Sequence, residues 1–131
     1  LVILSSWIDG CSHKHALCQR LTNLDGRTLP ARLINVHDSS APFLVSIDQS
    51  HGSHKVQYAT GDETNMPKLL RTNENALQQG IDAMTLPPVF RDSITMCGYL
   101  GIHYLWIDAL CLIQDDDTDC AREIARMGNI Y

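Results

Sequence analysis

The sequence contains no long apolar run and no excess of positive charge. Its apolar stretches are far shorter than the roughly 20 residues that a membrane-spanning helix needs, so no membrane span is expected. Leu1–Leu4 is apolar but lacks the basic flank and the length of a signal peptide. The formal net charge of −5 gives no electrostatic basis for binding nucleic acid, which requires a basic face.

Several catalytic signatures are also missing. The sequence has no Gly-rich phosphate loop and no Ser-His-Asp pattern. Its cysteines are odd in number and follow no secretory signal, which predicts free thiols in a reducing compartment and hence a cytoplasmic protein. They are Cys11, Cys18, Cys97, Cys111 and Cys120. The last three occupy apolar positions, where a thiol behaves as a small hydrophobe rather than a nucleophile.

The clearest signal is the stretch from Gly101 to Tyr131. Tyr104–Ile107 is a short unbroken apolar run, which is typical of a strand buried on both faces of a parallel sheet. Asp108 ends the run and is expected at the carboxyl end of the strand, because an ionised carboxylate is costly inside a sheet. Ligands bind at that edge in open α/β sheets, so Asp108 is either a ligand-site residue or a loop cap.

A helix is expected after the acidic run Asp115–Asp117. Carboxylates before a first turn accept hydrogen bonds from free backbone N–H groups. The run lacks the alternating spacing and distal Glu of a calcium loop, so capping is favoured over a Mg²⁺ or Ca²⁺ site. Apolar residues at helical spacing predict the buried stripe of this helix: Cys120, Ile124, Met127 and Tyr131.

Three strands and two helices are expected upstream. The strands are predicted to form an antiparallel ribbon and lie at Leu29–Val36, Phe43–Ile47 and Val56–Thr60. Thr72 is expected to cap a helix over Asn73–Ile81. A second helix over Pro88–Leu100 is predicted to end at Gly101 in the left-handed conformation and to pack beside the Tyr104–Ile107 strand.

Residues 1–28 support two interpretations. Spacings of three and four predict one polar–aromatic helix face made by Trp7, Cys11, His15 and Cys18. Zinc-binding residue types also occur here, although without a Cys-x-x-Cys pair: Cys11, His13, His15 and Cys18. The helix face is favoured over zinc. His51 and His54 are expected in an exposed loop rather than as metal ligands.

One family resemblance emerges from these residues. Residues 100–116 read Leu-Gly-Ile-His-Tyr-Leu-Trp-Ile-Asp-Ala-Leu-Cys-Leu-Ile-Gln-Asp-Asp, and Glu123, Met127 and Ile130-Tyr131 follow. The pattern resembles the central signature of the heterokaryon incompatibility (HET) domain of filamentous fungi, over roughly Tyr58–Tyr131. It implies an N-terminal flank at 1–28, a β-rich segment at 29–60 and a partial HET domain at 61–131.

The chain also departs from the HET pattern. Family members carry a strand reading roughly Tyr-x-x-Leu-Ser-Tyr-Cys-Trp-Gly, whereas this chain continues from Tyr58 as Ala-Thr-Gly-Asp-Glu. Cys120 stands where the family usually has Trp, and members continue beyond the position of Tyr131. The comparison therefore implies an incomplete domain, and a degenerate fragment without function is one alternative.

The resemblance implies an α/β fold with an incomplete parallel sheet, similar to Toll/interleukin-receptor (TIR) domains, preceded by a short antiparallel β region. HET proteins act with protein partners in non-self recognition and trigger cell death. Some TIR relatives cleave NAD with a helix-borne Glu, which by analogy makes Glu123 a candidate catalytic residue beside Asp108 and Asp115. NAD would then be a substrate, and no bound cofactor is expected.

Two functions stay open at this point. One is a cell-death effector that acts by association, and the other is a TIR-like hydrolase that cleaves NAD. Glu123 has a plainer alternative role, because arginines at positions 122 and 126 allow it to form ion pairs on a solvated helix face.

Overall fold

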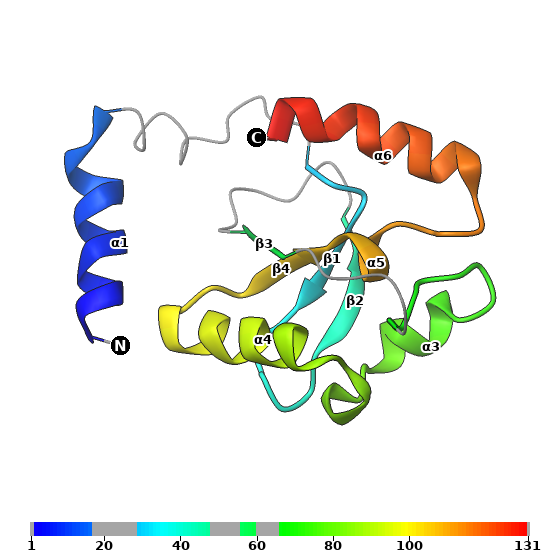
Figure 1. Cartoon of the computed structure of the whole chain (residues 1–131), viewed down its shortest axis with the longest axis horizontal. Coiled ribbons are helices and arrows are strands. Elements are labelled where there is room, and N and C mark those ends of the chain that lie inside the picture. The colour runs from blue at the N-terminus through cyan, green and yellow to red at the C-terminus, as the bar shows by residue number, and fades with distance from the viewer. Residues whose placement is uncertain (1, 17–28, 48–55, 60–65, 131) are drawn as a thin grey trace.

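The computed structural model describes residues 2–16, 29–47, 56–59 and 66–130 (Figure 1). In chain order the elements are α1 (Val2–Lys14), β1 (Arg32–Asn35), β2 (Phe43–Ser46), β3 (Val56–Ala59), α3 (Glu74–Gln79), the 3₁₀ helix η2 (Ala83–Thr85), α4 (Pro88–Leu100), β4 (Tyr104–Ile107), α5 (Asp108–Cys111) and α6 (Asp117–Ile130). This mixed content confirms the predicted α/β class.

Four strands form one sheet in the order β2-β1-β4-β3. β1 pairs antiparallel with both β2 and β4, whereas β3 runs parallel to β4. The predicted antiparallel ribbon is therefore right for the first two strands and wrong for the third, which lies at the opposite edge. The predicted parallel sheet is found in the described strands only as the β3–β4 pair, because β1 lies on the other side of β4 in the antiparallel direction. The described strands do not establish the TIR-like fold.

β4 is an interior strand, as its sequence predicts. It lies between β1 and β3, and Leu105, Trp106 and Ile107 are each at most 2% exposed. Successive side chains of a strand point to opposite faces, so the strand is covered on both sides. The register with β1 pairs Ile34 with Leu105, which places the start of β1 near the carboxyl end of β4.

α4 covers the predicted residues and has the predicted ends. Pro88 stands in its first turn, where the missing N–H costs nothing. Gly101 ends the helix in the left-handed conformation at φ 65°, and the N–H of Ile102 donates to the carbonyl of Cys97 at 2.9 Å. In Figure 1, α4 and α6 lie on opposite sides of the sheet.

α3 starts later and ends earlier than predicted. Thr72 does not cap it; Asn73 precedes the helix and makes no side-chain cap. The Asn73 side chain instead accepts the N–H of Leu70 at 2.8 Å, so it stabilises the preceding turn. After the helix, the N–H of Ile81 donates to the carbonyl of Pro42 at 2.8 Å, which ties this region to the β1–β2 hairpin.

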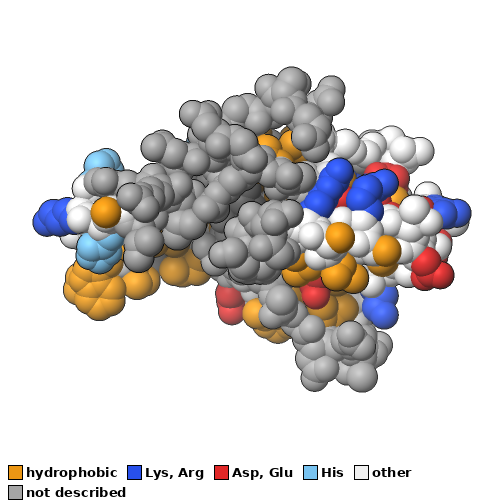
Figure 2. Space-filling view, turned by 90° about the horizontal axis from the view of Figure 1, so that it is seen from above, with side chains coloured by type: hydrophobic (Ala, Val, Ile, Leu, Met, Phe, Trp, Pro, Cys, Tyr) orange, Lys and Arg blue, Asp and Glu red, His pale blue; other side chains and the backbone are white. Residues whose placement is uncertain are grey.

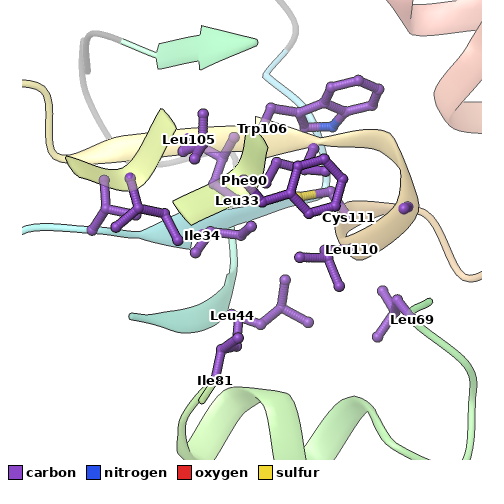
Figure 3. Packing of buried hydrophobic residues seen from close by; sticks show 14 of the residues in the cluster. Leu33, Ile34, Leu44, Leu69, Ile81, Phe90, Leu105, Trp106, Leu110 and Cys111 are labelled. Atoms are coloured by element: carbon purple, nitrogen blue, oxygen red, sulfur yellow. The ribbon is translucent and has the colours of Figure 1, made fainter. Parts of the chain in front are cut away.

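One hydrophobic cluster joins the hairpin to the later elements (Figure 3). Its largest fully buried side chains include Leu33, Ile34, Leu44, Leu69, Phe90, Ile94, Leu105, Trp106, Ile107 and Leu110. Strands β1, β2 and β4 and helices α4 and α5 all contribute. Residues before and after position 50 therefore share one core.

α1 contributes its apolar side chains to the surface instead. Figure 2 shows hydrophobic side chains gathered over this helix, and Val2 and Trp7 are 85% and 68% exposed. The predicted helix is present. Of the residues predicted to share one face, Cys11 is half-buried, whereas Trp7 and His15 are exposed. Cys18 lies outside the described residues.

Replacing the central side chain of β4 tests this core. Leu105→Ala is expected to lower the free energy of unfolding by about 2–5 kcal/mol, because it removes buried methyl groups and leaves a cavity. Urea unfolding followed by Trp fluorescence measures the change. Val89→Ala, at a 46% exposed position of α4, is the control and is expected to change stability by less than about 1 kcal/mol. Equal losses for the two variants would contradict the placement of β4.

Candidate functional site

Asp108 lies where its sequence position predicts, directly after β4. It is the first residue of α5 and is half-buried. Its Oδ1 atom accepts the N–H of Ala109 at 2.8 Å. The carboxylate thus bonds a backbone group in the first turn of its own short helix, which matches the loop-cap alternative.

The acidic run before α6 acts as a cap, as predicted. Asp116 Oδ1 accepts the N–H groups of Thr118 and Asp119, both at 3.1 Å. The Arg71 guanidinium donates to Asp116 Oδ2, at 2.7 Å from Nη2, and holds the pKa of that carboxyl below its usual value. Asp115 Oδ1 accepts the backbone N–H of Arg71 at 3.0 Å. Both carboxylates therefore fasten the loop before α3 to the start of α6.

Glu123 is buried in α6 with both carboxylate oxygens engaged. Its side chain is 3% exposed, and Oε2 accepts the backbone N–H of Ala31 at 2.8 Å. Oε1 accepts from Arg126 at 2.8 Å and from Arg122 at 3.4 Å. The predicted pairing with these arginines is confirmed, but the predicted solvated face is wrong. Ala31 lies just before β1 and needs a buried acceptor at this point.

The structure also reveals a pair that sequence reasoning missed. Arg32, at the start of β1, is 7% exposed, and Asp119 in α6 is 3% exposed. The Arg32 guanidinium is hydrogen-bonded to Asp119 Oδ2 and donates from Nε to the carbonyl of Cys111 at 2.9 Å. Asp119 Oδ2 also accepts the N–H of Ile113 at 3.0 Å. The sequence feature that could have indicated this pair is the charged residue Arg32 directly before the apolar run that starts at Leu33.

Together these groups form an arginine–carboxylate cluster of Arg32, Asp119, Arg122, Glu123 and Arg126. Arg122 bridges the two acids, because its Nη2 is bonded to Asp119 Oδ1 and its Nε faces Glu123. Charged side chains of both signs lie together over α6 in Figure 2. In the described part of the chain, no side-chain polar atom buried in this way lacks a hydrogen-bond partner.

The cluster lies at the edge where the sequence predicts a ligand crevice. Extending the β1–β4 register by two residues from the Ile34–Leu105 pair places Arg32 beside Ile107, at the carboxyl end of β4. The chain's own side chains thus fill this position. Asp108, Asp115 and Glu123 make their hydrogen bonds to three different groups, namely Ala109, Arg71 and the Ala31–arginine set.

The buried face of α6 differs from the predicted apolar stripe. Cys120 and Met127 pack partly against the core, but Ile124 is 59% exposed. Asp119 and Glu123 take the inward positions because Arg32 and the N–H of Ala31 require buried acceptors. Tyr131 lies outside the described residues.

Comparison with known proteins now adds to this geometry. The model of the heterokaryon incompatibility protein (HET) family matches residues 55–131, which is more than half of the chain. The chain belongs to the HET family. No curated protein and no solved structure matches it. The HET match begins just before β3 and contains α3, α4, β4, α5 and α6, while β1 and β2 precede it.

Metal and membrane features are limited in this HET chain. Among residues 2–16, 29–47, 56–59 and 66–130, no three His, Cys, Asp or Glu side chains are arranged to hold a metal ion. Cys18, which belongs to the predicted zinc alternative, lies outside the described residues, and so do His51 and His54. None of the described helices has the length and apolarity to cross a membrane.

The cysteines of the HET segment occupy apolar positions, as predicted, with Cys97 and Cys111 buried and Cys120 half-buried. Cys97 and Cys111 are each 1% exposed, and burial raises the pKa of Cys111 to about 12. Burial also raises the pKa of Cys97 and of Cys120. Because the thiolate is the nucleophile, a raised pKa keeps these groups protonated and unreactive at neutral pH.

Alkylation mapped by peptide mass spectrometry checks this assignment. With the native full chain at pH 8, Cys97 and Cys111 are expected to react at least about ten-fold more slowly than the half-buried Cys11, because they are enclosed and protonated. In denaturant the three rates are expected to converge. Rapid native labelling of Cys111 would contradict the packing of α5.

Removing one member of the buried ion pair tests the cluster. Asp119→Ala is expected to destabilise the fold by about 3–5 kcal/mol, because it leaves Arg32 buried without its carboxylate. Asp117→Ala, at an exposed first-turn position of the same helix, is the control, with an expected loss below about 1 kcal/mol. Chemical denaturation at pH 7 measures both, and similar losses would argue against a buried pair.

Proposed function

We propose that this HET chain is an effector of non-self recognition that triggers cell death by associating with protein partners in the cytoplasm, without cleaving NAD. Membership of the HET family supports the incompatibility role in general. The choice of association over chemistry rests on one observation, which is the engagement of Glu123.

A catalytic carboxylate must come within hydrogen-bond distance of the group on which it acts. Glu123 is 3% exposed, and both its oxygens accept bonds from groups of the same chain. A substrate would have to displace the N–H of Ala31 and the guanidinium of Arg126, and leave both without their acceptor. Such groups are costly to leave unpaired when buried. This arrangement supports a structural role for Glu123.

The other candidate carboxylates support the same conclusion. Asp108 bonds the backbone of α5, and Asp115 bonds the backbone of Arg71. Each stabilises a turn next to the sheet. The TIR-like alternative requires these acids to line one open edge with Glu123, and that edge is occupied by Arg32.

The test compares cell killing with NAD cleavage by the full chain. The chain is expressed from an inducible promoter in a filamentous fungal host, and viability and cellular NAD are followed together. In parallel, purified chain is incubated with NAD and released nicotinamide is measured. Killing that precedes any fall in NAD, with no nicotinamide released in vitro, is the expected result.

Matched variants make the outcome decisive. Glu123→Gln keeps the size of the side chain, and Asp117→Asn changes an exposed acid of the same helix. Near-ultraviolet circular dichroism confirms that each variant is folded. Nicotinamide release that Glu123→Gln abolishes and Asp117→Asn preserves would establish the hydrolase instead. If the chain neither kills the cells nor cleaves NAD, the result would indicate a degenerate fragment.

A further inference from the structure

We infer that Arg32, which lies upstream of the HET match, is a positioning residue that selects the rotation of α6 on the sheet. The inference does not depend on the proposed function. It starts from a conflict within α6. Its sequence carries an apolar stripe of Cys120, Ile124 and Met127, yet the structure buries Asp119 and Glu123 and leaves Ile124 59% exposed.

The two settings of α6 differ by about a quarter turn. Successive residues of an α-helix are about 100° apart, so replacing the inward Asp119–Glu123 face with the stripe centred between Cys120, Ile124 and Met127 requires a rotation of roughly 90°. The rotated helix would bury an Ile side chain and expose two carboxylates. Hydrophobic burial alone favours that rotated setting. Some other interaction must hold α6 in the observed one.

Arg32 and its neighbour provide that interaction. The Arg32 guanidinium bonds both Asp119 on α6 and the carbonyl of Cys111 on α5, and the N–H of Ala31 bonds Glu123. A third element lies within reach, because Glu74 of α3 is 4.0 Å from Arg32 Nη1. The planar, rigid fork of a guanidinium fixes the relative directions of its partners. Rotating α6 would remove the Asp119 carboxylate from Arg32 and leave only the more distant Glu74 carboxylate near the buried guanidinium.

Strand β1, which carries Arg32, is itself firmly packed. β1 is an interior strand, and Leu33, Ile34 and Val36 are fully buried. The N–H of Val36 donates to the carbonyl of His103 at 2.9 Å, next to β4. The hairpin is therefore part of the HET fold in this chain, and the described core extends back at least to the buried Pro30, before the matched residues 55–131.

A buried ion pair adds little net stability, because desolvation offsets most of its attraction. Replacing it with apolar groups of similar size is therefore expected to preserve the fold while removing every contact that Arg32 makes to α6. Arg32→Met combined with Asp119→Leu makes this change. α6 should then turn its apolar stripe toward the sheet, and position 124 should become buried.

Thiol labelling reports that rotation directly. Ile124→Cys places a thiol at the diagnostic position of the full chain, and Ala125→Cys places one at an exposed position that faces water in both settings. Labelling rates are mapped by peptide mass spectrometry. With Arg32→Met and Asp119→Leu, labelling at position 124 is expected to slow on the order of ten-fold, with no change at position 125.

The other outcomes overturn the inference. Unchanged rates at both positions would mean that Arg32 does not set the rotation of α6, and that packing or the bond from the N–H of Ala31 to Glu123 does. Faster labelling at both would mean that Arg32 merely keeps the helix attached. Asp119→Asn is a milder variant that keeps the side-chain shape. It is also expected to slow labelling at position 124, and unchanged labelling there would count against the inference. Hydrogen exchange tests whether the hairpin belongs to the HET fold. Rapid exchange of the Leu33–Asn35 amides, with the β4 amides still protected, would refute that inference.

Discussion

The hydrogen-bonded ion pair between Arg32 and Asp119 is the interaction on which the arrangement of this chain depends. It joins the first strand of the sheet to the last helix, and the same guanidinium reaches the carbonyl of Cys111 between them. Because both charges are buried, each requires the other, and neither side can move alone without a large desolvation cost. The cap at Asp116 and the bond from Ala31 to Glu123 extend the same constraint along α6.

Local chemistry made much of the second half of the chain predictable. An unbroken apolar run located β4 residue for residue, and Pro88 and Gly101 marked both ends of α4. The acidic run before α6 was correctly read as a cap. These features depend on neighbours within a few residues, which is the range over which sequence patterns carry information.

Long-range partners were not predictable in the same way. The pairing of β1 with β4 was not predicted, and it brought Arg32 to an edge where the sequence suggests an open crevice. The α6 stripe was misjudged because Ile124 is more apolar than Glu123, and only the distant Arg32 and Ala31 explain why the acid is inside. Asp108 and Asp115 were placed near strand and helix ends and Glu123 within the last helix, but their separate partners could not be predicted from spacing.

The great distance along the chain between the bonded groups has a consequence for biosynthesis. Arg32 precedes Cys111 by 79 residues and Asp119 by 87. A ribosome that adds roughly 5–20 residues per second takes on the order of 4–18 s to cover that interval. For most of this time, until Tyr104–Ile107 is made, β1 lacks its neighbour β4, so its apolar side chains and one edge face water. Chaperones that bind nascent extended segments therefore have their opportunity before the final helix emerges.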